Sequence, residues 1–264
     1  MKITVHNTIQ KICILFLAVF ALASCTKDDD TNPDGNGSGY LLLVTEFKNN
    51  GVTVGRYEFD DKNRMTAFHS YDGEGAHAVS ATYTYDERNR LLLVTNKLVD
   101  GTLVSTIEHV YEGNDDKPVS AVTTNYAGAV VVWNITYSYA NNQLTETIIQ
   151  SAPAPEIINV YTYNANGDLT SLKTNLGGIW AGTTEYGDYD DKNSPSMLGN
   201  PFDWKIPYRH NFRSFKTTQE SGVTEDQFYK YTYNDSGYPV KAEVYDRATN
   251  ELVETHEYTY KKAN

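Results

Sequence analysis

Polar and apolar residues alternate along much of this chain in stretches of about nine residues, the spacing expected of β-strands. The stretch ending at Ala140 shows the pattern well: Trp133, Ile135, Tyr137 and Tyr139 alternate with Asn134, Thr136 and Ser138. Successive side chains of a strand point to opposite faces, so the aromatic residues of this stretch share one face. The alternation therefore predicts strands with one polar and one aromatic face.

An aromatic-x-aromatic pair with a polar middle residue recurs along the chain, mostly at intervals of 24 to 28 residues. The intact pairs begin at Tyr57, Tyr83, Tyr137, Tyr161, Tyr231 and Tyr258, and degenerate copies cover residues 109–111 and 187–189. Nearly every pair is followed by residues rich in Asp, Asn and Gly, which favour tight turns. Two strands and two turns per unit account for the period.

Tandem hairpins of this kind predict an all-β antiparallel meander of about 15–16 strands over residues 40–264. The meander can form an open curved sheet or close into a porin-like barrel, which at this size would leave a lumen. We expect the aromatic face to form the core, because cross-strand aromatic pairs and burial both stabilise it. A stripe that stacks against sugars is the alternative.

The expected sheet is soluble rather than membrane-spanning. A lipid-facing strand needs an apolar residue at every second position, whereas Glu251, Glu254 and Glu257 fall on both faces of the last strand. The chain also ends in residues 260–264 (YKKAN), without the terminal aromatic residue that resembles an outer-membrane assembly signal.

One interval in the repeat is 44 residues long, which indicates an insertion at residues 190–211 in place of a turn. Loops of this length in compact domains are usually functional or disordered, and this one is rich in aromatic residues and proline. Candidate ligand-binding residues are therefore Phe202, Asp203, Trp204, Tyr208 and Arg209, with Trp204 stacking on a sugar or peptide. The alternative is a structural plug whose aromatic residues are buried at the end of a barrel.

The first 24 residues are expected to be a signal peptide. Lys2 and Lys11 precede or flank a short apolar run at 12–22, and Leu22-Ala23-Ser24-Cys25 resembles the lipobox of bacterial lipoproteins. We expect lipidation of Cys25, followed by a flexible tether over residues 25–39. The Lys27-Asp28-Asp29 segment resembles a surface-export signal of Bacteroidota-type lipoproteins, which implies a surface-exposed outer-membrane lipoprotein; a periplasm-facing protein is the alternative.

The chain is acidic, with 34 Asp and Glu against 22 Lys and Arg, which argues against nucleic acid as a partner. The mature chain would hold one cysteine, Cys25, so a disulfide, a thiol nucleophile or a cysteine-ligated metal is not expected. The histidines lack metal-ligand spacing, and no nucleophile elbow or phosphate loop occurs. We expect no cofactor and no enzymatic activity.

The signature Tyr-x-Tyr-Asp/Asn-x-x-Gly/Asn-x-Leu resembles the YD repeats of Rhs-type proteins, most closely at residues 83–91 and 161–169. Together with the lipobox and the acidic tether, it resembles an uncharacterised family of Bacteroidota surface lipoproteins. That resemblance covers residues 40–262 and implies a porin-like β domain, without implying any catalytic residue.

Three functions remain open from the sequence. The first is a lipid-anchored surface protein, bound to the membrane through Cys25, that binds a glycan or protein partner without catalysis. The second is a structural or envelope-accessory lipoprotein with no small ligand. The third is a glycan-active hydrolase, which would need two carboxyl groups about 5–9 Å apart in a cleft.

Overall fold

The computed structural model describes residues 40–151, 154–207 and 209–264. The expected signal peptide, Cys25, the tether and Tyr208 lie outside these residues. Sixteen strands follow one another: β1 (Leu42–Asn49), β2 (Val52–Phe59), β3 (Met65–Tyr71), β4 (His77–Tyr85), β5 (Leu91–Leu98), β6 (Leu103–Val110), β7 (Ser120–Asn125), β8 (Val131–Ala140), β9 (Gln143–Gln150), β10 (Ile157–Tyr163), β11 (Leu169–Leu176), β12 (Ile179–Gly187), β13 (Ser214–Gln219), β14 (Gly222–Tyr233), β15 (Pro239–Asp246) and β16 (Leu252–Lys262).

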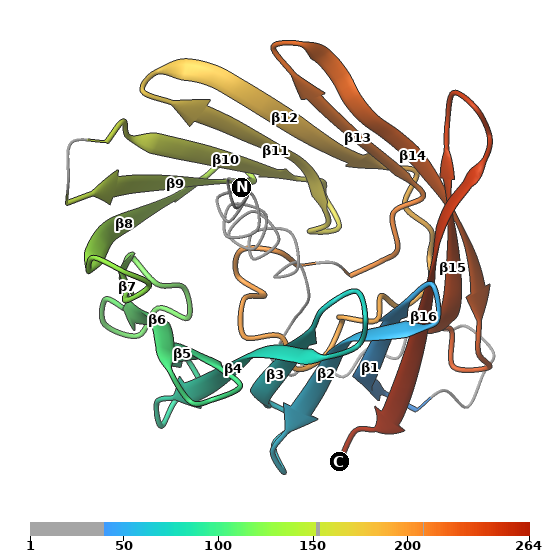
Figure 1. Cartoon of the computed structure of the whole chain (residues 1–264), viewed down its shortest axis with the longest axis horizontal. Coiled ribbons are helices and arrows are strands. Elements are labelled where there is room, and N and C mark those ends of the chain that lie inside the picture. The colour runs from blue at the N-terminus through green and yellow to red at the C-terminus, as the bar shows by residue number, and fades with distance from the viewer. Residues whose placement is uncertain (1–39, 152–153, 208) are drawn as a thin grey trace, which may run out of the picture.

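Each strand pairs with its neighbours in sequence, and β1 pairs with β16 to close the ring (Figure 1). The closing pair is antiparallel, from Leu42 opposite Lys262 to Asn49 opposite His256. The predicted all-β meander is therefore confirmed, and of the two shapes left open by the sequence the chain adopts the closed barrel. No helix in the described residues is long and apolar enough to cross a membrane.

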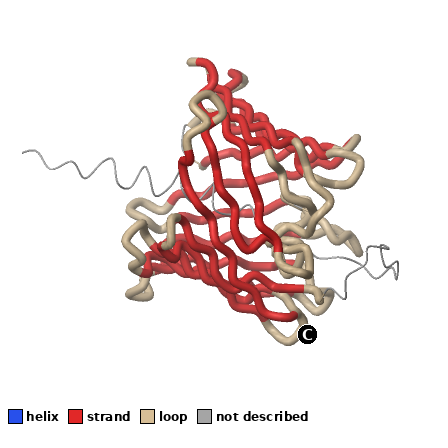
Figure 2. Tube along the Cα trace, turned by 90° about the vertical axis from the view of Figure 1, so that its right-hand side faces the viewer, coloured by secondary structure: helices blue, strands red, loops and turns tan. Residues whose placement is uncertain are grey.

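Loops gather at the two ends of the barrel (Figure 2). The turns that follow the aromatic pairs, together with residues 188–207 and 209–213 between β12 and β13, form one end, which we call the plugged rim. The other hairpin turns, such as 50–51, 99–102, 177–178 and 247–251, form the opposite end, which we call the open rim.

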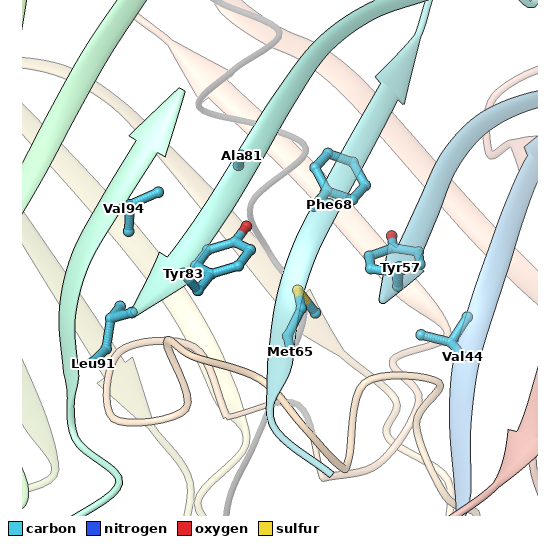
Figure 3. Close-up of a cluster of buried hydrophobic side chains, with 8 residues drawn as sticks. All are labelled: Val44, Tyr57, Met65, Phe68, Ala81, Tyr83, Leu91 and Val94. Atoms are coloured by element: carbon cyan, nitrogen blue, oxygen red, sulfur yellow. The ribbon is translucent and has the colours of Figure 1, made fainter. Parts of the chain in front are cut away.

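The aromatic face of the strands points into the barrel, as expected for a core. Tyr57, Tyr83 and Tyr161 are 7%, 6% and 3% exposed. Tyr57 and Tyr83 belong to a cluster on β1 to β5, drawn in Figure 3 with Val44, Met65, Phe68, Ala81, Leu91 and Val94. A second buried cluster is centred on Leu144, Tyr161 and Leu169.

The second tyrosine of the pair has its own structural role, a hydrogen bond that we call the tyrosine latch. Its hydroxyl donates to a backbone carbonyl at or just before the start of the preceding strand: Tyr85 to Met65 at 2.7 Å, Tyr111 to Leu91 at 2.9 Å, Tyr139 to Pro118 at 2.9 Å, Tyr189 to Leu169, and Tyr260 to Pro239 at 2.6 Å. The degenerate repeats retain the tyrosine at this position. Each latch joins two adjacent strands at the plugged rim, where no hairpin turn connects them.

Turn chemistry explains the residue after the pair. The Asp86 carboxylate accepts hydrogen bonds from the backbone N–H groups of Arg88 and Arg90, and Asn164 does the same for Asn166 and Asp168. These bonds form an Asx turn. Asn89, which follows in the Asp86 turn, has a φ of 65°, a left-handed conformation that asparagine tolerates better than most residues.

Candidate functional site

The described part of the insertion at residues 190–211 folds into the barrel and closes its plugged rim; we call residues 188–207 and 209–213 the plug (Figure 1). Its two ends meet where Asn193 bridges His210 and the Ser194 N–H donates to the Arg209 carbonyl at 3.2 Å. The N–H of Met65 donates to the Gly199 carbonyl at 3.2 Å, which fixes the middle of the plug to β3. A Cβ at Gly199 would lie 2.5 Å from the Phe59 ring, so only glycine fits there.

The aromatic residues of the plug pack against the inner wall rather than forming an exposed platform. The Phe202 ring lies 6.2 Å from those of Tyr83 and His109. The Trp204 ring is edge-on to Tyr137 at 4.8 Å and to His109 at 6.0 Å. This arrangement corresponds to the structural-plug alternative, and it gives both aromatic residues a packing role.

An ion pair with a buried acid pins the plug to the wall. The Lys205 Nζ lies 2.5 Å from Oε1 of Glu146, a β9 residue that is 3% exposed. The other carboxylate oxygen accepts hydrogen bonds from Asn159 Nδ2 at 2.9 Å and the Tyr161 hydroxyl at 3.1 Å. Burial alone would raise the pKa of Glu146, but Lys205 and these donors outweigh it and lower that pKa. Glu146 is therefore a buried carboxylate with every neighbour arranged for its charged form.

A second buried acid holds the end of the plug. Asp168 is fully buried in the turn before β11, and its Oδ1 accepts hydrogen bonds from the backbone N–H groups of Arg209 and His210, both at 3.1 Å. The His210 Nδ1 lies 3.0 Å from Asp168 Oδ2. Arg209 itself pairs with Asp203 at 3.3 Å inside the plug. The candidate residues Asp203 and Arg209 thus contact each other.

The plug also redirects the tyrosine latch in the two repeats next to it. The Tyr163 hydroxyl donates to the Lys205 carbonyl at 2.6 Å, and the Tyr233 hydroxyl donates to the Asp190 carboxylate. In the other repeats that have this tyrosine, the acceptor lies at or just before the start of the preceding strand. The plug is therefore bonded into the repeat pattern of the barrel.

His109 lies beneath the plug and is electrically neutral. It is 6% exposed, and burial, reinforced by the nearby Lys205 charge, lowers its pKa to about 4. Its ring contacts both Phe202 and Trp204. A neutral imidazole packs between aromatic rings without the desolvation cost of a cation.

Between the plug and the open rim, the inner wall is accessible to solvent. Register places Thr217 and Glu225 opposite each other on the inner face, beside Thr184, and Glu225 is exposed. Trp133, Ile148 and Tyr229 face the same lumen and are half-buried. Sixteen strands enclose more space than their own side chains fill, so a compartment remains above the plug.

The structure does not assemble a metal centre from the described residues: no group of three or more His, Cys, Asp or Glu side chains there is placed to hold an ion. Several acids of the plugged rim are engaged in turns, ion pairs or tyrosine contacts, among them Asp86, Asp168, Asp190 and Asp203. The chemistry of this region is that of a fixed, hydrogen-bonded closure.

Sequence reasoning singled out Phe202, Asp203, Trp204 and Arg209, and the structure brings all four into the plug. It missed Lys205, Glu146, Asp168 and His109. Two of these left a signal: Glu146 interrupts the apolar alternation of Leu144 and Ile148, and His109 replaces the first aromatic residue of its repeat. A charged or polar residue on an apolar face indicates a specific partner.

Comparison with known proteins adds information on the fold. No protein-family model matches the chain, and no curated protein matches it. Among solved structures, a porin-like protein from Bacteroides vulgatus ATCC 8482 has a TM-score of 0.50 and 14% identity, covering 83% of this chain and 99% of its own. A porin-like protein from Bacteroides uniformis ATCC 8492 has a TM-score of 0.49 and 12% identity, covering 83% and 98%. The first likeness confirms the expected porin-like β domain.

Proposed function

We propose that this protein is a lipid-anchored, non-catalytic barrel of the outer membrane that stands in water at the cell surface and holds a ligand in its plugged lumen. The observation that carries the proposal is the division of side chains between the two faces of the wall. Most aromatic residues of the strands point inward, and the outward positions are predominantly polar. The stacked pair of Phe228 and Tyr245 is an aromatic exception on the outer face.

Polar outward residues occur on strands from different parts of the wall. Thr82 and Thr84 on β4, and Asn134, Thr136 and Ser138 on β8, are exposed. On β14 to β16 the outward row includes Lys230 opposite Glu243, and Lys241 opposite both Thr232 and Glu257. Apolar outward residues lie among polar ones, as where Val160 pairs with Thr145 on one side and Lys173 on the other.

A wall of this composition favours water over lipid. Each lysine or arginine on the lipid face of a barrel costs about 2–4 kcal/mol at the bilayer midplane. The outer wall also has ion pairs such as Arg56 with Glu46 at 3.1 Å and Lys241 with Glu243 at 2.8 Å, which are ordinary features of a hydrated surface.

The plug supports a closed container rather than a pore. It spans the plugged rim and is fixed by two buried acids, Glu146 and Asp168. A lumen that is accessible from one end binds a molecule without conducting it.

Membrane attachment in this proposal comes from the N-terminus. The lipobox-like Leu22-Ala23-Ser24-Cys25 supplies an acylated Cys25, and Lys27-Asp28-Asp29 directs the protein to the surface. A barrel carried on a lipidated tether has no need of a lipid-facing wall. Stable anchoring requires more than one acyl chain, which a lipobox cysteine provides.

A membrane pore is the second candidate, favoured by the closed ring of sixteen strands. The two candidates separate in planar-bilayer recordings of the purified full-length lipoprotein. We expect no channels from the natural protein, nor from Lys205→Met, in which the pin of the plug is lost. Steps of conductance, larger in Lys205→Met than in the natural protein, would overturn the proposal in favour of a plugged pore.

A further inference from the structure

One side of the lumen above the plug is lined by apolar side chains that extend from the buried core to the open rim. Register aligns one inward row of five residues across five consecutive strands: Ile135, Ile148, Ile157, Leu176 and Ile179. Exposure rises along this row, from 8% at Ile135 to 44% at Leu176 and 71% at Ile179. Partly exposed isoleucine and leucine side chains in one continuous row form a hydrophobic track inside the barrel.

The strands on another side of the ring line the same lumen with carboxylates and aromatic rings; β15 and β16 lie across from β8 and β9 in Figure 1. Glu254 on β16 lies 2.9 Å from His256 Nε2 and accepts a hydrogen bond from Asn49 Nδ2 at 2.7 Å. The ring of Phe47 is 5.2 Å from that of His256 and 5.4 Å from that of Tyr258. The track and this acidic, aromatic side form an amphipathic compartment.

Electrostatics connect Glu225 on β14 to the same side. Burial raises the pKa of Glu225, and the neighbouring Glu254 charge raises it further. Burial also raises the pKa values of Tyr229 and Tyr258, and the Glu254 charge adds to both shifts. Two acids and two phenol rings therefore share a local region in which a positive charge is stabilised.

From this geometry we infer that the lumen binds an amphiphile with one alkyl chain and a cationic head, the chain on the isoleucine track and the head beside Glu225, Glu254 and Tyr229. The inference rests on the proposed function, since it requires the lumen to be a binding compartment. Burial of the alkyl chain against the track removes apolar surface of both from water.

Charge selects the head. The described inward strand positions between the plug and the open rim include Glu225 and Glu254 but no lysine or arginine. Lys205 faces this space from the plug, and its charge is matched by Glu146. An anionic head would meet carboxylates on the described inward strand positions and, in Lys205, a cation already paired with Glu146. A quaternary ammonium can contact both the carboxylates and the aromatic faces.

The open rim supplies a route of entry. Besides Leu176 and Ile179, it exposes Leu98, Val99, Val130, Val223 and Leu252. These residues lie at or beside the hairpin turns of that rim. An alkyl chain approaching the mouth therefore meets apolar side chains before it reaches the track.

The test is calorimetric titration of the full-length lipoprotein in phosphatidylcholine vesicles with decyltrimethylammonium below its micelle concentration, with empty vesicles as the blank. Decyl sulfate and tetramethylammonium are the comparison probes. We expect saturable binding of the decyl cation, and no saturable binding of either comparison probe.

Neighbouring inward and outward residues provide matched variants. Ile148→Gln places an amide on the track, while Ile149→Gln changes the next residue of β9 on the outer face; Ile157→Gln and Ile158→Gln repeat the comparison on β10. We expect the inward variants to weaken binding about tenfold and the outward ones to leave it unchanged. Glu254→Gln should weaken binding of the decyl cation, whereas Glu257→Gln, on the outer face of β16, should leave that binding unchanged.

Equal binding by the inward and outward variants, or equal binding of decyl sulfate, would overturn the inference. Thermal melting of each variant identifies any that fails to fold. If a β9 variant fails, the comparison of Ile157→Gln with Ile158→Gln on β10 tests the inference. If only this inference is wrong, the titration shows no selective binding while the bilayer recordings still show no channels. If the proposed function is wrong, the recordings show channels, so the two failures are distinguishable.

Discussion

Replacing Lys205 by methionine is expected to lower the free energy of unfolding by about 3 kcal/mol, because the Glu146 carboxylate then stays buried without its counter-ion. Breaking a buried ion pair on one side typically costs about 3–5 kcal/mol. The lower value applies because Asn159 and Tyr161 still donate hydrogen bonds to Glu146. The Lys205 side chain is itself 19% exposed.

The effect has a definite pH dependence. In the natural protein Lys205 and the hydrogen-bond donors hold the pKa of Glu146 below its unfolded value, so this stabilisation is present above about pH 4.3 and is lost as pH falls through the folded pKa. Without Lys205, we expect burial to raise the pKa of Glu146 instead. The variant then protonates Glu146 as pH falls, and the stability gap between the two proteins narrows.

The assay is urea unfolding at pH 7.5, 6, 5 and 4.5, followed by tryptophan fluorescence. Lys192→Met is the matched control, since Lys192 pairs at 3.4 Å with the exposed Asp191 and should matter little. The double variant Glu146→Gln/Lys205→Met should recover part of the loss. An unchanged midpoint for Lys205→Met, or a gap that does not vary with pH, would refute the pinned-plug account.

Three further substitutions test the barrel itself. Tyr85→Phe removes the latch to Met65 and should cost about 1 kcal/mol, while Tyr126→Phe at an exposed position should cost nothing; a melting curve for each decides, and equal melting would exclude the latch as a stabilising bond. Tyr161→Ala empties a buried site and should cost about 3–5 kcal/mol in urea unfolding, so near-natural stability would argue against a core role. Asn142, with a φ of 58°, should lose about 1 kcal/mol on replacement by alanine but not by glycine, and calorimetric melting that ranks the two variants the other way would contradict the left-handed turn.

The architecture follows from the sequence because the repeat is periodic in two ways. Alternation of period two places aromatic residues on one face, and the recurrence of turn residues sets the hairpin length. Together they predict the meander and the number of strands. Whether the meander closes depends on the pairing of β1 with β16, about 200 residues apart, which no local pattern encodes.

The plug was predictable in place and in composition, because residues 190–211 break the interval and contain aromatic residues. The residues that the plug contacts on the barrel wall were not predictable from the sequence. Lys205 meets Glu146, and Arg209 and His210 meet Asp168, only because the loop turns into the lumen. The latch from Tyr163 to the Lys205 carbonyl depends on the same path.

The structure also gives one candidate residue a different role from the one expected from the sequence. Trp204 is the kind of side chain that stacks on sugars, but its ring packs edge-on against Tyr137 on the inner wall. The amphipathic lumen was hidden for a different reason: the row from Ile135 to Ile179 becomes continuous only through register across five strands. Sequence reveals the face of each strand, while register reveals which residues become neighbours.

The account depends most on the polar face of the wall meeting water, and cysteine accessibility measures this directly. Thr136→Cys reports the outer face of β8, Asp235→Cys an exposed turn, and Ala121→Cys the buried inner face. Each full-length variant is treated with a membrane-impermeant maleimide in opened membrane fragments, before and after addition of detergent. The account predicts that Thr136→Cys reacts as fast as Asp235→Cys in both conditions, while Ala121→Cys remains protected. Protection of Thr136→Cys until detergent is added would show that lipid covers the wall and would contradict it.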